Sequence, residues 1–207
     1  MIVSNNNIIL SYNGTIIDYT PVTLLLDTYT NASVAYSLRK LRTSYTGNSI
    51  RVRRSNDNAE QDIGFTTAGE LNTTALTTFV GSNSAFIVRW YDQSGNANNA
   101  TQSTPANQPR IVNAGVIDSV NAKTSFRFDG SNDTLQLTSV ITPPSGVYTA
   151  YGVGKRLASN NNFTILGDST VIGATPTLLL THLSSNRFYL QRNLRTDRIP
   201  TRKATYW

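Results

Sequence analysis

Short strand-like segments separated by turn residues set the strongest limit on the fold of this chain. Their residues are β-branched, aromatic or alternately apolar and polar, and Gly, Pro, Asn and Asp bound them. They lie at residues 49–54, 85–91, 110–112, 116–117, 147–155, 163–166, 177–181 and 187–191. Such a series, without an internal repeat, predicts an all-β fold arranged as a β-sandwich.

Two hairpins are expected. Asn13-Gly14, the dipeptide favoured in two-residue type I′ turns, separates the apolar segments 8–12 and 15–19. A lone hairpin is marginally stable in water, so this one should pack on the domain body or on another chain. The second hairpin would have arms at 125–128 and 134–137. We therefore divide the chain into an N-terminal attachment segment, residues 1–30, and a β-sandwich domain, residues 31–207.

Two short helices interrupt the strands. Apolar residues recur at helical spacing from Val34 to Tyr45, which predicts a helix over residues 31–45. A second helix should begin at Asn72, a favoured N-cap residue, and end at Gly81.

Charge, the length of apolar segments and the cysteine count argue against several classes of function. Charged residues make up 14% of the chain and the net charge is +6, but no helix-turn-helix, zinc-finger or RNA-recognition pattern accompanies that charge. We expect no nucleic-acid partner. No segment has the length of a transmembrane helix, so we expect no membrane insertion, and no signal peptide is recognised. The absence of cysteine excludes disulfides and thiolate metal sites.

The end of segment 85–91 offers a sugar-binding hypothesis. An aromatic pair there runs into a loop rich in amide side chains, and rings beside amides can stack on and hydrogen-bond to a sugar. The candidate residues are Trp90, Tyr91, Asp92, Gln93 and Asn96. The alternative is an ordinary strand end, in which Asp92 caps its own turn and only one of the two rings is free.

Catalytic and metal-binding chemistry has few candidates. A retaining glycosidase needs two carboxyl groups about 5–5.5 Å apart, and the available residues are Asp92, Asp129, Asp133 and Asp168. Asp129 and Asp133 are also the candidate calcium ligands, although they lack the spacing of a calcium hand. His182 is the single histidine and follows a leucine-rich run, so we expect a strand-end residue there, and without a plausible nucleophile no catalytic triad can be built. We assign no catalytic residue and no cofactor, and leave calcium open as an alternative.

Five motifs follow one another in the order of a known set. They are Ala35–Arg39, Ile50–Asp57, Asp62–Phe65, Trp90–Asn96 and Gln108–Ile111. The set resembles the first half of the family 54 α-L-arabinofuranosidase catalytic domain. It is also similar to the concanavalin-like (laminin-G-type) sandwich modules of tailed-phage virion proteins. Both resemblances imply a jelly-roll of two antiparallel sheets.

The departures from the enzymes concern the catalytic apparatus. The arabinofuranosidases resembled carry a vicinal disulfide, whereas this chain has no cysteine. They place a Glu nucleophile and an Asp acid/base late in the domain, but here the only glutamates are Glu60 and Glu70. After residue 140 the only carboxylates are Asp168 and Asp197. The ending at Trp207 predicts either a fragment or a partner chain that completes the fold.

From the resemblance we expect a non-enzymatic structural or adhesive component of a phage particle, such as a fibre, tail or capsid-decorating protein. It would assemble in the host cytoplasm, reside in the virion, form a homo-oligomer with other virion subunits, and contact a cell-surface glycan. The docking residues would be Ile8, Leu10, Tyr12, Ile16 and Tyr19. The alternatives are a free carbohydrate-binding module and an arabinofuranosidase-like glycosidase.

Overall fold

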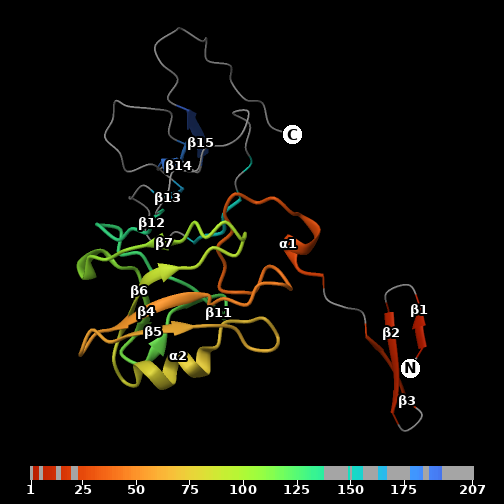
Figure 1. Ribbon diagram of the computed structural model, residues 1–207. Coiled ribbons are helices and arrows are strands. Elements are labelled where there is room, and N and C mark those ends of the chain that lie inside the picture. Colours follow the sequence, from red (N-terminus) through yellow and green to blue (C-terminus); the bar gives the residue numbers. More distant parts are fainter. Residues whose placement is uncertain are drawn as a thin grey trace. The chain divides into compact units, whose positions relative to one another are not determined.

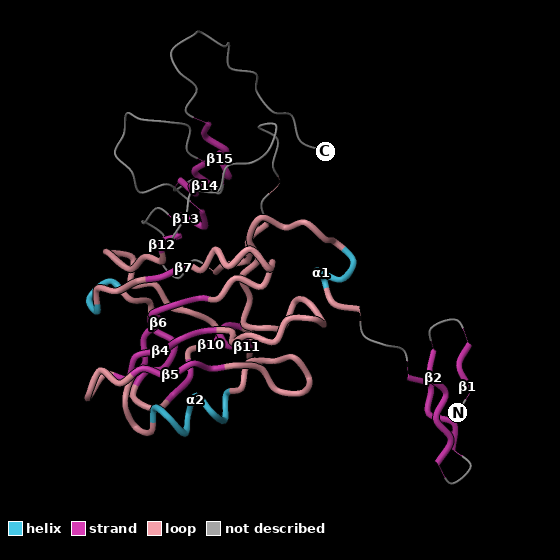
Figure 2. The backbone as a smooth tube through the Cα atoms, in the orientation of Figure 1, coloured by secondary structure: helices cyan, strands magenta, loops and turns pink. Residues whose placement is uncertain are grey.

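The computed structural model describes residues 2–4, 7–12, 15–19, 23–137, 149, 151–155, 163–166, 178–183 and 187–192. The chain divides into two units, Met1–Val147 and Tyr148–Trp207, which are described in turn (Figures 1 and 2). Every strand pair in the described residues is antiparallel, and the α-helices among them are short. The all-β fold class is therefore confirmed. No helix in this described part is long and apolar enough to cross a membrane.

A three-stranded sheet begins the first unit. Its strands are β1 (Ile2–Ser4), β2 (Asn7–Tyr12) and β3 (Thr15–Tyr19). Tyr12 pairs with Thr15, which confirms the hairpin predicted at residues 13–14. The register separates the five docking candidates. Ile8 lies opposite Tyr19 and shares a face with Leu10 and Tyr12, whereas Ile16 takes the other face. Their role in assembly stays a prediction.

The main sheet of the first unit has strand β6 at its centre. Its strands are β4 (Ile50–Arg54), β5 (Glu60–Ile63), β6 (Ala85–Trp90), β7 (Ala100–Thr101), β8 (Arg110–Asn113), β9 (Val116–Ile117) and β12 (Gln136–Leu137). The order is β12-β7-β6-β4-β5, and β8, which also pairs with β6, carries β9. Strands β10 (Ser119–Val120) and β11 (Lys123–Thr124) form a separate ribbon. The strands expected around residues 50, 85, 110 and 116 are confirmed.

One face of this sheet forms the hydrophobic core. Ile50, Val52 and Ile87 are fully buried on it, because alternate residues of a strand point to one side. Helix α2 (Thr73–Val80) covers them with Leu76 and Val80 (Figure 1).

The beginning and end of α2 agree with the sequence prediction. The Asn72 side chain accepts a hydrogen bond from the Ala75 amide at 3.0 Å, and Gly81 follows the helix. An N-cap of this kind satisfies an amide that the first helical turn leaves without a partner.

The helix predicted over residues 31–45 is wrong. A short helix, α1 (Leu25–Thr28), precedes this stretch, and the stretch itself is irregular. The reason is Gln93, whose side chain is fully buried. It donates to the carbonyl oxygens of Ser37 and Arg39 at 3.0 and 2.9 Å, and accepts from the Leu41 amide at 2.8 Å. These backbone groups take a tertiary partner in place of helical hydrogen bonds.

The second predicted hairpin is also wrong, because its two arms pair with different strands. Arg127 pairs with Arg110 of β8, whereas Gln136 of β12 pairs with Thr101 of β7. The strand expected at 147–155 is not formed by the described residues 149 and 151–155. The rest of that segment lies outside the described residues.

The second unit contains one described sheet. It consists of β13 (Phe163–Leu166), β14 (Leu178–Leu183) and β15 (Arg187–Arg192), in that order. The three strands predicted in this region are thus confirmed. His182 lies on β14 at the register position between Phe163 and Phe188.

Candidate functional site

The loop after β6 is organised by the buried carboxylate of Asp92. This side chain is 4% exposed and accepts four hydrogen bonds. One oxygen takes the amides of Ala35 and Ser94 at 2.8 and 2.9 Å. The other takes the Ser94 hydroxyl at 2.6 Å and the Asn98 amide at 3.1 Å. Asp92 therefore caps its own turn and also joins the loop to a segment 57 residues earlier.

Gln93 and Asn96 strengthen the same connection. The amide of Gln93 is used entirely on the backbone of residues 37–41. The Asn96 side-chain amide donates to the carbonyls of Ala32 and Ser33 at 3.0 and 3.1 Å. The amide groups that the sequence offered for sugar binding thus hold residues 32–41 in place. Sugar binding at this loop stays a prediction. It would depend on the rings of Trp90 and Tyr91, because the amide groups are already hydrogen-bonded to the backbone.

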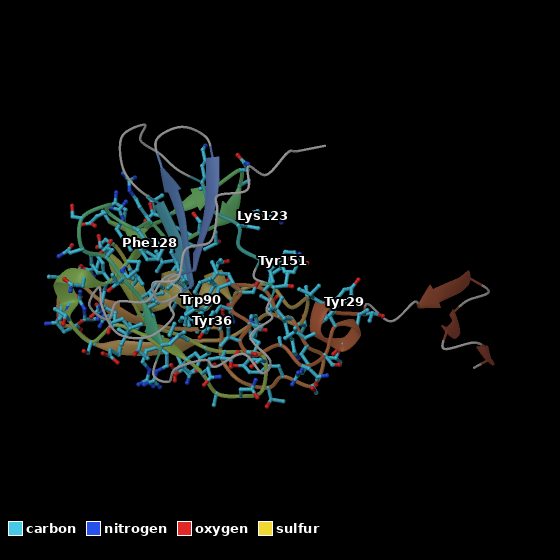
Figure 3. The ribbon with its side chains drawn as sticks, turned by 90° about the horizontal axis from the view of Figure 1, so that it is seen from above. Tyr29, Tyr36, Trp90, Lys123, Phe128 and Tyr151 are labelled. Atoms are coloured by element: carbon cyan, nitrogen blue, oxygen red, sulfur yellow. The ribbon has the colours of Figure 1, made fainter. Side chains whose placement is uncertain are left out.

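The two rings of the predicted sugar site lie on opposite faces of the sheet. Trp90 lies on the core side next to Tyr36, with ring centroids 5.3 Å apart (Figure 3). Its ring also packs edge-on against Phe126, at a centroid distance of 4.7 Å. Tyr36 donates its hydroxyl to the Asn98 carbonyl. Burial, with the nearby Asp92 charge, raises the pKa of the Tyr36 phenol. Trp90 is therefore part of a half-buried aromatic cluster.

Tyr91 joins a polar cluster on the other face. Its hydroxyl donates to Asp62 at 2.7 Å, and Arg51 donates to both oxygens of that carboxylate at 2.8 Å. The hydrogen bonds from Arg51, together with that from Tyr91, lower the pKa of Asp62. Burial raises the pKa of Tyr91, and the bond to Asp62 adds to this effect. Asp62 is thus held ionised at neutral pH.

Sequence reasoning did not single out Asp62 or Arg51 as site residues. The alternation at 49–54 predicts a strand with one wet face, and that face is where Arg51 lies. The position of Asp62 depends on the pairing of β5 with β4, where Arg51 lies opposite Asp62. Strand pairing is not readable from a single segment.

The turn from Asp129 to Asp133 holds a second pair of carboxyl groups. The Asp129 side chain accepts the amides of Ser131 and Asn132 at 2.8 and 3.3 Å, and Asp133 accepts the Asp129 amide at 2.8 Å. Hydrogen bonds from the turn backbone lower the pKa of Asp129. Partial burial, with the Asp129 charge, raises the pKa of Asp133.

An exposed aromatic residue precedes this turn in the sequence. The Phe128 side chain is 47% exposed and directly precedes Asp129 (Figure 3). The turn therefore combines an ionised carboxylate, a carboxyl group whose proton is held more tightly, and an open aromatic surface.

Metal ligands are not concentrated in the residues that the structure describes, where no group of three or more His, Asp or Glu side chains is brought together. Calcium at Asp129 and Asp133 stays a prediction. Both side chains already accept backbone amides within their turn.

Comparison with known proteins gives the family. The model of the catalytic domain of α-L-arabinofuranosidase B matches residues 22–164, which include both the Asp92 loop and the Asp129 turn. The match covers well over half of the 207 residues. The chain belongs to this family. No curated protein matches the chain.

Solved structures similar to the chain are arabinofuranosidases as well. A GH54 α-L-arabinofuranosidase soaked with a cyclic sulfate inhibitor is 32% identical over 39% of this chain, with a TM-score of 0.35. An arabinofuranosidase complexed with arabinofuranosyl-α-1,2-xylobiose is 25% identical over 49% of this chain, with a TM-score of 0.36. The chain spans only 18% and 24% of the lengths of these two proteins.

The arabinofuranosidase family match confirms one expectation from the sequence and corrects two. The relation to the family 54 catalytic domain is confirmed. The main functional prediction, a structural or adhesive phage component, is wrong, and so is the prediction that the chain is not an enzyme, because the matched family model is that of a catalytic domain. The error came from weighting missing features, cysteine and late glutamates, above the ordered motifs that the family model recognises. The alternative of an arabinofuranosidase-like glycosidase is the better-supported one.

Proposed function

We propose that this chain is part of a glycoside hydrolase that removes α-L-arabinofuranosyl residues from a glycan. The family match over residues 22–164 is the observation that carries this proposal. The related proteins act as arabinofuranosidases over much longer chains, so the activity of the whole enzyme is part of the proposal.

The described carboxylates differ in their availability for catalysis. Asp92 is saturated by four hydrogen bonds, and Asp62 is held by Arg51 and Tyr91. Asp57 and Asp118 are paired with Arg54 and Arg110. Asp27 accepts hydrogen bonds from Thr43, and Glu60 and Glu70 lie next to Arg51 and Arg39. Among the described carboxylates, Asp129 and Asp133 then remain as a pair, and their pKa values are displaced in opposite directions. A pair of that kind is suited to one acid role and one ionised role.

In the proposed reaction Asp133 acts as the acid and Asp129 as the nucleophile. Asp133 gives its proton to the glycosidic oxygen as the bond from that oxygen to the anomeric carbon breaks. A carboxylate oxygen of Asp129 bonds to the anomeric carbon, which forms a glycosyl ester. Asp133, now ionised, removes a proton from the water that hydrolyses the ester. Phe128, whose exposed side chain directly precedes Asp129 in the sequence, would offer an aromatic face to the sugar ring.

The test is hydrolysis of 4-nitrophenyl α-L-arabinofuranoside by the full chain, followed as release of nitrophenolate. Asp129→Asn should lower kcat about a thousandfold, because the nucleophile is lost. Asp133→Asn should lower kcat by a factor of about 10²–10⁴ on an arabinosyl oligosaccharide, since general acids contribute that much. The same change should cost less on the nitrophenyl substrate, whose leaving group needs less protonation.

Asp57→Asn is the matched control. Asp57 is also an exposed turn aspartate that accepts a backbone amide, from Ala59 at 3.1 Å, and its replacement should leave kcat unchanged. Absence of hydrolysis by the unchanged chain would overturn the proposed function. Hydrolysis that survives both changes, but is lost in Asp168→Asn, would retain the function and reject the assigned pair.

A further inference from the structure

A row of polar side chains crosses the main sheet on the face opposite the core. Successive strand pairs place Asp62 beside Arg51, Arg51 beside Arg89, Arg89 beside Thr101, and Thr101 beside Gln136. We name these five residues the polar row. They belong to β5, β4, β6, β7 and β12, so the row runs perpendicular to the strands. At a strand spacing of about 4.8 Å it extends over about 19 Å.

Arg89 has no acceptor in this row. The other arginines of strands β4, β6 and β8, all within the described residues, donate to carboxylate, amide or carbonyl oxygens: Arg51 to Asp62, Arg53 to Gln108 and Asn58, Arg54 to Asp57 and the Phe79 carbonyl, and Arg110 to Asp118. Within the part of the chain that the structure describes, the buried Nε atom of Arg89 has no hydrogen-bond partner. The guanidinium lies over the Tyr91 ring, 5.6 Å from its centroid.

The charge of Arg89 is only partly compensated, because the nearby carboxylate of Asp62 attracts it without a direct hydrogen bond. Its cross-strand neighbour is another arginine, Arg51, and like charges in that position are destabilising. The single carboxylate of the polar row, Asp62, is bound by both donor groups of Arg51. Because its Nε is buried, Arg89 would bind an incoming carboxylate through its two Nη groups, which can donate two parallel hydrogen bonds.

We propose that the polar row binds an acidic glycan, with the carboxylate of one uronate unit at Arg89 and the hydroxyls of neighbouring units along Thr101 and Gln136. The choice of a glycan as ligand rests on the proposed function. The contact between Arg89 and a carboxylate rests on the geometry of the row alone.

The row suits a sugar with an isolated charge better than a continuous polyanion. Asp62 and Glu60 lie on the same strand face at one end of the sheet, within 2.8 and 3.8 Å of Arg51. These carboxylates would repel a phosphate at every repeat of a nucleic acid. The half-buried ring of Tyr91 beside Arg89 gives a surface on which a sugar can lie.

The experiment is calorimetric titration of the full chain with tetragalacturonate and, separately, with its fully methyl-esterified form. The two probes have the same length and hydroxyls and differ in charge. We expect the free acid to bind at least about tenfold more tightly, as a charge-assisted hydrogen bond would give. Arg89→Gln should remove this difference, Arg89→Lys should keep part of it, and added salt should reduce it.

Arg39→Gln is the control, because it removes the same charge from an exposed ion pair with Glu70 outside the polar row. Gln136→Ala, at an exposed edge position, should weaken the binding of tetragalacturonate but leave the binding of galacturonate monomer unchanged. This variant tests the proposal if Arg89→Gln fails to fold. Equal affinity for acid and ester would overturn the proposal, as would tighter binding of an oligothymidylate of matching length. A charge-dependent difference without arabinofuranoside hydrolysis would retain this site and reject the proposed function.

Discussion

The two aspartate-led turns of this domain begin with the same local chemistry and end in different surroundings. In both, the first aspartate accepts the amide of the serine two residues later, Ser94 at 2.9 Å and Ser131 at 2.8 Å. Asp92 is buried and reaches the distant Ala35 amide. Asp129 is exposed, and its partners lie within four residues.

This difference separates a structural loop from a candidate reactive one. A carboxylate whose oxygens accept hydrogen bonds from distant backbone amides stabilises the fold, and few of its acceptor sites stay available to a substrate. A carboxylate that closes only its own turn keeps an oxygen accessible. The motif Asp-x-Ser therefore does not predict function by itself. The long-range hydrogen-bond partners of the aspartate distinguish a structural turn from a candidate reactive one.

The largest loss of unfolding free energy is expected from a substitution at Gln93, the fully buried residue of the Asp92 loop. Gln93→Leu keeps the volume but leaves the carbonyl of Arg39 and the amide of Leu41 without these partners, while the Ser37 carbonyl keeps only the Ser49 hydroxyl. Each unsatisfied buried group costs about 1–3 kcal/mol, so the free energy of unfolding should fall by about 4 kcal/mol. Urea unfolding measures the change.

Asn132→Leu is the counterpart in the exposed turn. Its side chain makes one hydrogen bond, to Asn107 at 2.9 Å, on the surface. The change in unfolding free energy should stay within about 0.5 kcal/mol, as for most surface substitutions. Equal losses in the two variants would contradict the contrast between the turns.

The next largest loss of stability is expected from replacing Asp92, and it is compared with the loss from replacing Asp129. Asp92→Ala removes four hydrogen bonds to a charged, buried acceptor, and should cost about 3 kcal/mol of unfolding free energy. Asp129→Ala removes local bonds that water can replace, and should cost far less. Thermal unfolding of both variants gives the difference. A loss in Asp129→Ala as large as that in Asp92→Ala would show that the second turn is also structural.

The same contrast between local and long-range partners explains which parts of the fold the sequence could predict. Asn72 and residues 13–14 act on their immediate neighbours, so the start of α2 and the first hairpin could be read directly. The helix over residues 31–45 failed because Gln93, more than fifty residues away, satisfies that backbone. The Asp129 turn was recognised, but its arms depend on pairing with β7 and β8. The polar row likewise exists only through strand register.

Glycine substitutions should sharpen the comparison by showing that the two backbones are alike. Gly95 and Gly130 have φ values of 99° and 81°. Each change to alanine should cost about 1 kcal/mol, because this region is strained for a residue with a Cβ atom. At Gly95 the new Cβ would also approach Arg42 Nη1 to 2.9 Å, a contact that this flexible side chain can relieve. Chemical unfolding should therefore give similar losses at the two positions, in contrast to the aspartates.

The smallest effect is the pH dependence of stability contributed by the exposed turn. Asp129 has a lowered pKa, so its contribution is present above the unfolded pKa of about 4 and is lost as the pH falls through its folded pKa. Asp133 has a raised pKa, so its contribution is present below about pH 4 and is lost as the pH rises through its folded value.

Thermal midpoints of the unchanged chain and both Asn variants, measured from pH 2.5 to 7, separate these opposite contributions. Asp129→Asn should remove part of the decline on the acid side. Asp133→Asn should remove part of the decline from pH 4 toward neutrality, because the buried carboxyl no longer ionises. If both variants changed the same side of the profile, the two carboxyl groups would not have displaced pKa values of opposite sign. The exposed turn would then lose the property that distinguishes it from the Asp92 loop as a candidate reactive site.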